Sequence, residues 1–513
     1  MLSWESKVPF ASVWSGTVAR YGNRPFLIFE APDGSVREWT YSEFDSEVSR
    51  AASLLTSLGV VPGRAVHLAL TNSPAFVALW IAINRLGAWM VPSDPMSKTP
   101  ELIDHIGRTK SVVGFCAAVR SKAYRTAAGI MSVIEIDETS TNLNFFPDNH
   151  FVDWPEVNAL DRAAVMFTSG TTGRPKGVEV TQANYAFAGK IMAEAVDLQV
   201  TDRQLVVLPL FHANAQYYSL ASAIWVGASV ALMCRFSASR FLEQVVQYGA
   251  TCASLFAAPL RMILAKGHPV DGIRLRHCWY AQNISQDQYD TLTAWFGCRP
   301  RQLYGMTETM AAVLTDEVKQ PLVHSMGYIT RGCSVDVQDD KGRSVSTDEI
   351  GEVVVGGTPG VTLFAGYLDD KSTTESSFRN GWFRTGDQAI RSDSGRHFFH
   401  GRGSDILKVA GENVSTAEIE AALSAHPLVF EAAVVGISDD IRDEVPFAFV
   451  VPIDSTKPPS LKDLYQWCDD QLAKVKCPKD IVLIDTLPRT SVGKIRKFVL
   501  AAEAKNQTQG QKK

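Results

Sequence analysis

Short apolar stretches alternate with longer amphipathic stretches through about the first 400 residues of the chain. Three of the short stretches, Ala65–Leu70, Gln204–Leu210 and Ala228–Met233, are rich in β-branched and aliphatic residues, as buried parallel strands are. Helical patterns such as "SPAFVALWIAINRLG" separate them. This alternation predicts an α/β fold with a parallel sheet between helices and argues against a β-sandwich.

The pattern changes after the string "GRGSDILKVAGENVS" (Gly401–Ser415). Helical patterns at Thr416–His426 and Leu461–Val475 then flank two apolar strands, Val429–Ile437 and Val445–Ile453. A chain of 513 residues is also too long for one compact core. We therefore predict a large α/β domain over residues 1–403 and a small α+β domain over residues 404–513.

Composition excludes several classes of function. The 50 basic and 55 acidic residues give a net charge of -5, without the basic excess that nucleic-acid binding requires. The longest apolar run, Ala75–Ile83, is under half of the ~20 residues of a membrane span. The first ten residues lack a signal-peptide pattern, and the 8 cysteines form no C-x-x-C pair. We expect a cytoplasmic protein without a membrane span; its oligomeric state stays open, with a homodimer as one alternative.

The string "FTSGTTGRPKG" (Phe167–Gly177) has the composition of an anion-binding loop. It is not a P-loop of the form G-x-x-x-x-G-K-[ST], because Pro175 stands where the second glycine should be and Gly177 follows Lys176. Its glycines nevertheless allow backbone N–H groups to approach a phosphate, and its hydroxyls add donors. It also follows a predicted buried strand. Composition alone leaves two readings open, a phosphate loop and a plain surface turn.

Further motifs favour the phosphate loop. The string Phe167–Gly177, "YGMTE" (Tyr304–Glu308), "TGD" (Thr385–Asp387), the stretch Gly401–Glu420 and "PRTSVGKIR" (Pro488–Arg496) occur in that order. Together they resemble the signature of the AMP-forming adenylating enzymes, which include acyl-CoA synthetases, adenylation domains of peptide synthetases and firefly luciferase. The resemblance covers nearly the whole chain. It implies a large N-terminal domain of several subdomains and a small, mobile C-terminal domain.

The resemblance also implies the reaction. Members of the family join a carboxylate to the α-phosphate of ATP, release pyrophosphate, and then transfer the acyl group from the adenylate to a thiol with loss of AMP. ATP, Mg²⁺ and CoA are therefore the expected cofactor and co-substrates of an acid–thiol ligase. The residues expected to hold the β- and γ-phosphates are Thr168, Ser169, Gly170, Thr171, Thr172, Gly173 and Lys176.

The catalytic residues carried over by motif lie in two strings. In "YGMTE" the resemblance implies that Tyr304 stacks on adenine, Thr307 bonds the α-phosphate and Glu308 holds Mg²⁺. In "PRTSVGKIR" it implies that Lys494 bridges the carboxylate and the α-phosphate during adenylation. Outside these strings, Tyr304 would be read as a core aromatic and Lys494 as a solvated surface lysine.

Three residues are expected around the nucleoside. The resemblance implies that Asp387 accepts the ribose hydroxyls, with support from Arg402, and that Phe399 lines the nucleoside. Without the resemblance, Asp387 would merely close a turn after Gly386. For Phe399, packing in a hydrophobic core is a competing interpretation.

The small C-terminal domain carries residues for both steps of the reaction. Gly411 matches the glycine that lines the pantetheine channel of the family, whereas Lys494 serves the first step. In the family this domain rotates between the two steps about a residue that corresponds to Ser404. That hinge is usually Asp or Lys, so serine departs from the pattern, and the neighbouring Asp405 is a candidate to replace the missing charge.

The acid substrate is the least determined part of the prediction. His212 in "FHANAQY" matches a histidine at the pocket mouth, where amino-acid-activating members carry Asp; a buried structural histidine is the alternative. Where many acyl-CoA synthetases have a glycine-rich turn, this chain has "YAQNIS", so Tyr280 and Ala281 should reshape or shorten the acyl tunnel.

Together with the glycine-poor turn, the strings "YGMTET" and "GISDDIRDEVPFAFVV" most resemble the carnitine/crotonobetaine-CoA ligase branch of the family. The predicted substrate is a small-molecule carboxylic acid, either of that branch or another bulky or compact acid, and the predicted acceptor is CoA. Two alternatives stay open: an enzyme that loads a separate carrier protein, and a non-catalytic nucleotide-binding relative.

Overall fold

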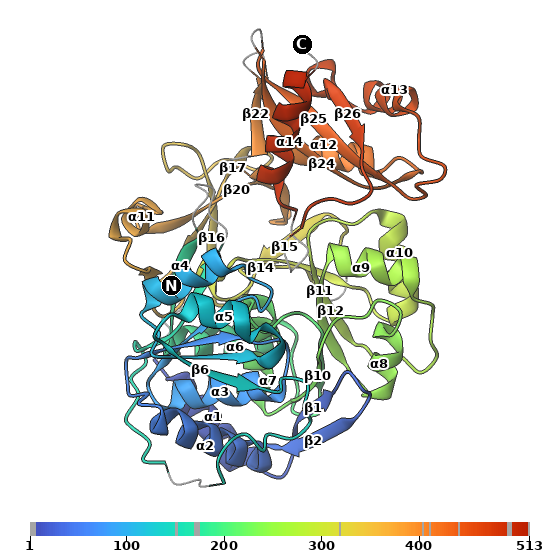
Figure 1. Ribbon diagram of the computed structural model, residues 1–513. Helices are drawn as coiled ribbons and strands as arrows, with labels where there is room; N and C mark the ends of the chain where they lie inside the picture. Colours follow the sequence, from blue (N-terminus) through green and yellow to red (C-terminus); the bar gives the residue numbers. More distant parts are fainter. Residues whose placement is uncertain are drawn as a thin grey trace. The chain divides into compact units, whose positions relative to one another are not determined.

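The computed structural model describes residues 7–148, 152–168, 175–317, 320–402, 405–409, 412–439, 442–489 and 495–510 (Figure 1). The chain divides into two compact units, residues 1–335 with 355–383 and residues 336–354 with 384–513. It passes between the units within β16 (Ser334–Gln338), β17 (Ile350–Gly356) and β20 (Trp382–Arg391). The predicted boundary after residue 403 marks the part of the chain that is expected to rotate; this division does not test it, so it stays a prediction.

The larger sheet of the first unit is mainly parallel, as the apolar pattern predicted. From its edge inward, the strands are β2 (Val36–Thr40), β1 (Pro25–Glu30), β10 (Ser229–Met233), β9 (Arg203–Val206), β11 (Cys252–Phe256), β12 (His277–Ala281) and β13 (Arg301–Tyr304). Each neighbouring pair from β1 to β13 is parallel, and β2 is the antiparallel hairpin partner of β1. β14 (Leu314–Thr315) and β15 (Ser325–Ile329) extend β13 in antiparallel fashion.

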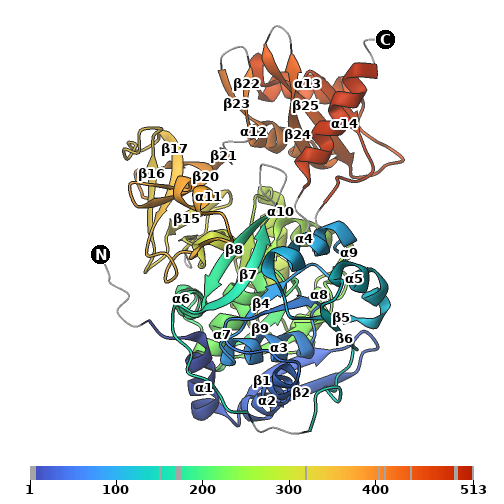
Figure 2. The same cartoon turned by 60° about the vertical axis from the view of Figure 1, so that its left-hand side comes forward.

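The second sheet of this unit carries the hairpin that holds the predicted phosphate loop. Its strand order is β18 (Gly366–Tyr367), β8 (Lys176–Thr181), β7 (Arg162–Thr168), β4 (Trp89–Pro92), β3 (Ala65–Ala69), β5 (Val113–Ala117) and β6 (Ser132–Ile136). β7 and β8 are antiparallel neighbours, visible side by side in Figure 2. From β7 to β6 the strands are parallel. The short β19 (Phe378–Arg379) pairs with the first residues of β20.

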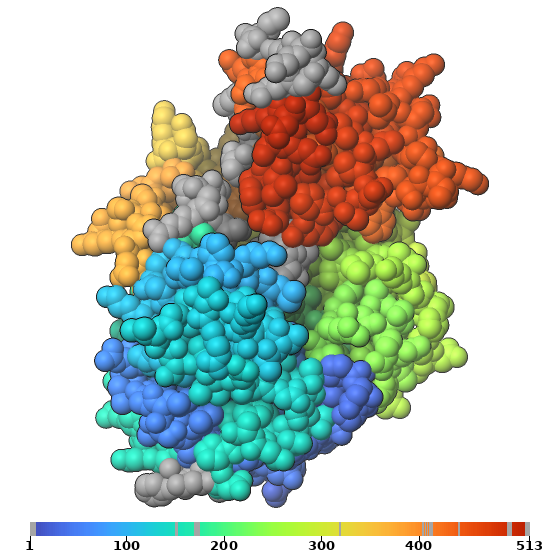
Figure 3. Space-filling view, viewed as in Figure 1, coloured from blue at the N-terminus to red at the C-terminus, as the bar shows by residue number. Residues whose placement is uncertain are grey.

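Helices cover these sheets. They are α1 (Phe10–Tyr21), α2 (Tyr41–Ser57), α3 (Pro74–Arg85), α4 (Thr99–Thr109), α5 (Ser121–Ala128), α6 (Gln182–Ala195), α7 (Ala221–Val226), α8 (Phe241–Gln247), α9 (Ala257–Lys266), α10 (Gln286–Phe296) and α11 (Lys371–Ser376). α3 is apolar on every side and is buried from Pro74 to Asn84, as such a pattern requires. α8, α9 and α10 bury one core with β9, β11 and β12; these helices are drawn in green in Figure 1, and the green surface of Figure 3 covers the same part of the chain.

The second unit contains β21 (His397–Arg402), the antiparallel partner of β20, and a separate sheet. The strands of that sheet are β23 (Glu412–Ser415), β22 (Ile406–Val409), β25 (Asp443–Pro452), β24 (Val429–Asp439) and β26 (Asp480–Leu483). Its helices are α12 (Thr416–Ser424), α13 (Leu461–Gln471) and α14 (Lys497–Gly510). The α+β character is as predicted, although α12 and α13 end a few residues earlier than the patterns indicated.

β24 has a core on both of its faces. Ala432 and Val434 belong to the cluster that includes α12 and α13, whereas Ala433 and Val435 belong to the cluster that includes α14. Successive side chains of a strand point to opposite faces, so one apolar run serves both clusters. This explains why "VFEAAVVGI" has no polar alternation.

A buried chain of polar side chains links the second sheet to α4 and α5. His67 Nδ1 lies 2.6 Å from the hydroxyl of Tyr124, and Ser93 Oγ lies 3.0 Å from His67 Nε2 and 2.8 Å from His105 Nδ1. The contacts are satisfied if Tyr124, His67 and Ser93 each donate to the next member, which requires both imidazoles to be neutral. Burial accordingly lowers the pKa of His67 to about 3 and that of His105 to about 4.

The two histidines predict a pH-dependent stability. Their pKa values are lower in the folded than in the unfolded protein, so their contribution to stability is complete above about pH 6.5 and decreases as the pH falls toward 4. Each should contribute a slope of ~1.4 kcal/mol per pH unit in that window. In thermal unfolding between pH 7 and 5, His105→Asn should therefore lose less stability than the wild type. Equal losses would contradict the assignment.

Candidate active site

Three of the predicted site residues lie at the carboxyl edge of the larger sheet. Ala281 is the last residue of β12, Tyr304 is the last residue of β13, and His212 follows the end of β9. Because β9, β11, β12 and β13 are mutually parallel, their carboxyl ends meet at one edge. Ligands of open α/β sheets bind at this edge.

The segment after β9 is held by its own backbone. The N–H of His212 donates to the carbonyl of Pro209 at 3.1 Å, and the imidazole packs against Phe211 with ring centroids 4.7 Å apart. A π-helix follows over Asn214–Leu220, a feature found frequently at functional sites. His212 is half-buried, which disagrees with the alternative of a fully buried structural histidine.

The π-helix packs directly against the "YGMTE" segment. A Cβ atom placed on Gly305 would lie 2.8 Å from the hydroxyl of Tyr218 and 2.9 Å from the carbonyl oxygen of Ala311. Both distances are shorter than van der Waals contact allows, so this position requires glycine. The close approach explains the glycine between Tyr304 and Met306.

Tyr280 and Ala281 lie in different surroundings. The side chain of Tyr280 is 1% exposed and belongs to the core under α8, α9 and α10, where its ring lies 6.4 Å from that of Tyr289. Burial raises the pKa of its hydroxyl. Ala281 is half-buried, and the next residue, Gln282, has a φ of 73°. A glutamine thus adopts the left-handed conformation in the turn where glycines were expected.

Glu308 lies in a short 3₁₀ helix, Thr307–Thr309, and is 4% exposed. Its carboxyl oxygen Oε1 accepts a hydrogen bond of 3.0 Å from the hydroxyl of Tyr367 on β18. Its backbone carbonyl accepts another, of 2.9 Å, from the N–H of Phe364. The half-buried Thr307 precedes it, so these contacts also fix the place of Thr307.

Tyr367 joins the "YGMTE" segment to the hairpin of the phosphate loop. The ammonium of Lys176 lies 4.8 Å from the centre of the Tyr367 ring, within cation–π distance. β18 pairs with β8 so that Tyr367 lies opposite Val178. The structure therefore brings Lys176 and Glu308 to one tyrosine. Sequence reasoning missed Tyr367, for which the available signal was the string "AGYLDD" after the core residue Phe364.

The loop itself is described at its two ends. Thr168 is the last residue of β7 and lies opposite Lys176, the first residue of β8, and its hydroxyl donates to the carbonyl of Lys176 over a long 3.5 Å. The predicted phosphate ligands between these ends lie outside the described residues; they are Ser169, Gly170, Thr171, Thr172 and Gly173.

In the second unit, Asp387 and Arg402 form a cross-strand pair. They lie opposite one another on β20 and β21, with Arg402 Nε 3.3 Å from Asp387 Oδ1. The backbone N–H of Asp387 donates to the hydroxyl of Thr385, which donates in turn to the carbonyl of Val353 on β17. The "TGD" turn is therefore anchored to a neighbouring strand. The carboxylate of Asp387 thus pairs with a cation, and its role toward the ribose stays a prediction.

Phe399 is on the same strand as Arg402 and is 36% exposed. That exposure disagrees with the competing interpretation of a core residue. A planar aromatic surface beside an Asp–Arg pair fits a nucleoside, but its role stays a prediction.

Lys494, Ser404 and Gly411 lie outside the described residues. Their neighbour in the chain, Asp405, is described: Lys497 Nζ lies 3.1 Å from its Oδ2 and 2.9 Å from Glu420 Oε1. Burial lowers the pKa of Lys497, but Glu420 and Asp405 raise it by more, so that it lies above its usual value. Asp405, which follows the predicted hinge Ser404, therefore forms an ion pair with Lys497, three residues after the predicted catalytic Lys494.

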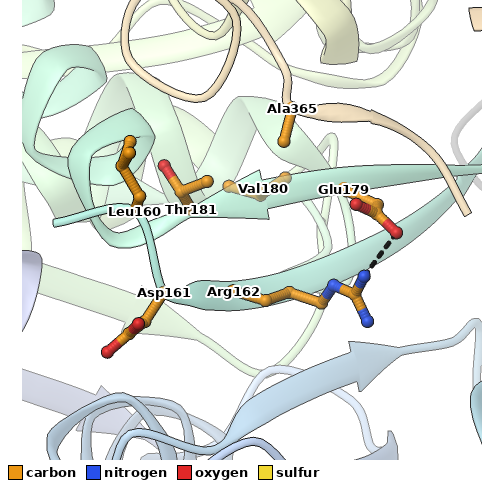
Figure 4. Close-up of a pocket in the computed structure, with 7 residues that line it drawn as sticks. All are labelled: Leu160, Asp161, Arg162, Glu179, Val180, Thr181 and Ala365. Atoms are coloured by element: carbon orange, nitrogen blue, oxygen red, sulfur yellow. Dashed lines mark hydrogen bonds and ion pairs between the residues drawn. The ribbon is translucent and has the colours of Figure 1, made fainter. Parts of the chain in front are cut away.

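A pocket of about 320 Å³ lies at the opposite end of the β7–β8 hairpin. In Figure 4, Arg162 and Glu179 point toward one another across this pocket, where they form an ion pair of 2.5 Å. Arg162 is six residues before Thr168 on one strand, a distance of about 20 Å. This pocket is thus remote from the residues that the motifs predict.

None of the helices within the described ranges is long and apolar enough to span a membrane. The same residues contain no group of three or more His, Cys, Asp or Glu side chains arranged to hold a metal ion. A cation at Glu308 would therefore need ligands from elsewhere, such as a bound phosphate.

The contact between Tyr367 and Glu308 predicts a measurable stability. Tyr367→Phe keeps the ring beside Lys176 and removes the hydroxyl that donates to a buried carboxyl group. We expect the free energy of unfolding to fall by about 1–3 kcal/mol in urea denaturation. Tyr21→Phe is a matched control, because its hydroxyl makes no hydrogen bond to any residue that the structure describes. A loss no larger than that of the control would contradict the role of this hydrogen bond.

Comparison with known proteins agrees with these motifs. A family model described as "AMP-binding enzyme" matches residues 14–368, and one described as "AMP-binding enzyme C-terminal domain" matches residues 418–494. The crotonobetaine/carnitine–CoA ligase of Salmonella agona (strain SL483) is 31% identical over 506 residues, which cover 94% of this chain and 97% of that protein.

Solved structures of other ligases are similar to this chain over nearly its whole length. The o-succinylbenzoate CoA synthetase (MenE) of Bacillus subtilis, in complex with its acyl-adenylate intermediate, is 27% identical with a TM-score of 0.83 and covers 96% of this chain and 98% of its own. ATP-bound MatB of Rhodopseudomonas palustris has a TM-score of 0.86 at 24% identity over 96% of this chain and 98% of its own, which shows the fold. The predicted fold class and acid–thiol ligase class are confirmed, and the chain belongs to the family of AMP-binding enzymes.

Proposed function

We propose that the protein joins a carboxylic acid to CoA in two steps, with ATP cleaved to AMP and pyrophosphate. The observation that carries this proposal is the meeting of Lys176 and Glu308 at Tyr367. It places the phosphate-loop lysine and the predicted metal ligand around one side chain. A nucleoside triphosphate with its Mg²⁺ needs a cationic side chain near its phosphates and a carboxylate near the metal ion.

The loop and Lys176 would hold the β- and γ-phosphates. Lys176 is a half-buried cation at the start of β8, directly after the loop. Thr168 at the other end supplies a hydroxyl, with Ser169, Gly170, Thr171, Thr172 and Gly173 between them as proposed ligands. A cation ~4 Å from a phosphate oxygen is worth ~4 kcal/mol at an effective dielectric of about 20, enough to orient the triphosphate.

Glu308 fits Mg²⁺ in the manner that this ion prefers. Mg²⁺ usually takes one or two protein carboxylates and completes its shell with phosphate oxygens and water. The single buried carboxyl group of Glu308, oriented by Tyr367, matches that demand better than a cluster of acids would. When bound, the ion would neutralise phosphate charge and align the α-phosphate that Thr307 contacts.

The nucleoside would bind through four residues. Tyr304 would stack on adenine from the end of β13. Asp387 would accept the ribose hydroxyls, because its carboxylate is held by Arg402 and by the anchored "TGD" turn. Phe399 would offer its exposed ring to the nucleoside.

In the first step, a carboxylate oxygen attacks the α-phosphorus and the bond to the β-phosphate breaks, releasing pyrophosphate. Lys494 would bridge the two anions and lower their repulsion. In the second step, a thiolate attacks the acyl carbon, the bond to AMP breaks, and AMP leaves. Rotation about Ser404 would exchange Lys494 for the segment of Gly411, which lines the path of pantetheine.

The acid should be compact. The turn before "YGMTE" carries Tyr280, Ala281 and Gln282 in place of glycines, which would leave less room for a long straight acyl chain. His212 stands where amino-acid-activating members carry Asp, which disfavours an α-amino acid. The named relatives act on crotonobetaine or carnitine and on o-succinylbenzoate, both compact carboxylates, and we propose a substrate of this size.

CoA is the proposed acceptor because the relatives that this chain matches over nearly their whole length are named as CoA ligases or synthetases. A phosphopantetheinyl carrier protein is the alternative acceptor.

The 8 cysteines are all free thiols, which favours the reducing cytoplasm. A homodimer stays a prediction, and sedimentation at micromolar protein would decide it.

A panel of carboxylic acids tests the proposed activity. We expect AMP formation that depends on CoA with compact acids, including quaternary-ammonium and aryl acids, and about tenfold or more lower kcat/KM with straight acids longer than about ten carbons. AMP release is scored with free CoA and, in parallel, with a phosphopantetheinyl carrier protein. Preference for the carrier would overturn CoA as the acceptor. No pyrophosphate exchange with any acid would favour a non-catalytic relative.

Two variants separate the half-reactions. Lys494→Ala should slow pyrophosphate exchange by on the order of a hundredfold to a thousandfold while ATP still binds, because only the transition state needs the bridging cation. Ser404→Pro should leave exchange largely intact and block thioester formation, because proline fixes φ at the hinge. Unchanged exchange in the first variant, or equal loss of both steps in the second, would refute the assigned role.

A further inference from the structure

Arg108 contacts the chain on both sides of the phosphate loop. Its Nη1 donates a 2.7 Å hydrogen bond to the carbonyl of Pro175, which follows the loop. Its guanidinium carbon lies 4.9 Å from the ring centre of Phe167, next to Thr168 at the other end. One side chain of α4 therefore reaches both stems of the loop.

Phe167 is held from a second direction. The imidazole of His105 stacks on its ring with centroids 3.9 Å apart and an angle of 5° between the planes. His105 and Arg108 are three residues apart on α4, so they lie on one face of the helix. That face presents a flat ring and a planar cation to the same phenylalanine.

Neighbouring side chains hold both Arg108 and His105 in place. Asp104 lies 3.2 Å from Arg108 Nη1, one helical turn away. His105 Nδ1 lies 2.8 Å from Ser93, which belongs to the buried chain that ends at His67 and Tyr124. The side chain of Arg108 is 19% exposed, so its contacts are shielded from most of the solvent.

We propose that Arg108 is a positioning residue for Lys176, whose backbone it holds through Pro175 on one side and Phe167 on the paired strand. The inference rests on the proposed role of Lys176 and deepens it. A cationic side chain whose backbone is already fixed loses less conformational entropy when it pairs with a phosphate. Arg108 therefore acts on binding of the β- and γ-phosphates and not on the nucleoside.

The test compares two nucleotides. AMP lacks the β- and γ-phosphates, so calorimetric dissociation constants for Mg²⁺-ATP and for AMP separate an effect on the loop from general damage. In Arg108→Met the dissociation constant for ATP should rise about tenfold, the size of one charge-assisted hydrogen bond, while that for AMP changes by less than about twofold. Arg108→Lys, which keeps the charge and one donor, should recover part of the loss and serves as the second variant if the methionine form fails to fold.

Arg125→Met is the matched control. Arg125 lies on the neighbouring α5 and pairs with Glu135 at 2.8 Å, on a solvent-exposed surface. Its removal costs one ion pair and should leave both dissociation constants within about twofold of the wild type. Equal weakening of ATP and AMP in Arg108→Met, or an unchanged ATP constant, would overturn the inference. A wild type that binds neither nucleotide would instead refute the proposed function.

Discussion

The hydroxyl of Tyr367 and the carboxyl group of Glu308 form the contact on which the candidate site depends. A carboxyl group that is 4% exposed is costly to bury without a donor, and Tyr367 provides one at 3.0 Å. The same ring carries the ammonium of Lys176 near its face. Because β18 pairs with β8 in a fixed register, the tyrosine cannot shift along the hairpin without losing main-chain hydrogen bonds.

Backbone geometry sets the rest of the site. Parallel strands bring the ends of β12 and β13 to one edge, and the π-helix after β9 packs so closely on Gly305 that no other residue fits there. The edge thus combines a rigid sheet with short, closely packed connections. Such a frame keeps the predicted site residues at set places, and holding reactants in a fixed orientation is a large part of what catalysis requires of a protein.

Local pattern was sufficient for some features and insufficient for others. The apolar runs at Gln204–Leu210 and Ala228–Met233 predicted buried parallel strands, since burial on both faces leaves a continuous signal; β10 agrees with the second run, whereas β9 already ends at Val206. Tyr367 could not be found in this way, because its importance comes from a register between strands almost two hundred residues apart. Tyr280 shows the same limit: its place in the turn before "YGMTE" suggested a pocket residue, and no pattern in the sequence indicated that its ring lies in the core beside α9 and α10.

Burial decides which histidines near the predicted phosphate loop carry a charge. His67 and His105 are neutral at pH 7, because burial lowers their pKa values, so they can stack and pass hydrogen bonds without adding cations. Arg108 contacts Phe167 and Pro175 at the two ends of the loop, and Lys176 follows Pro175 directly. Phe167 therefore contacts a neutral imidazole and a guanidinium from the same helix. The order of residues along α4, histidine three positions before arginine, is what provides both contacts from one helix face.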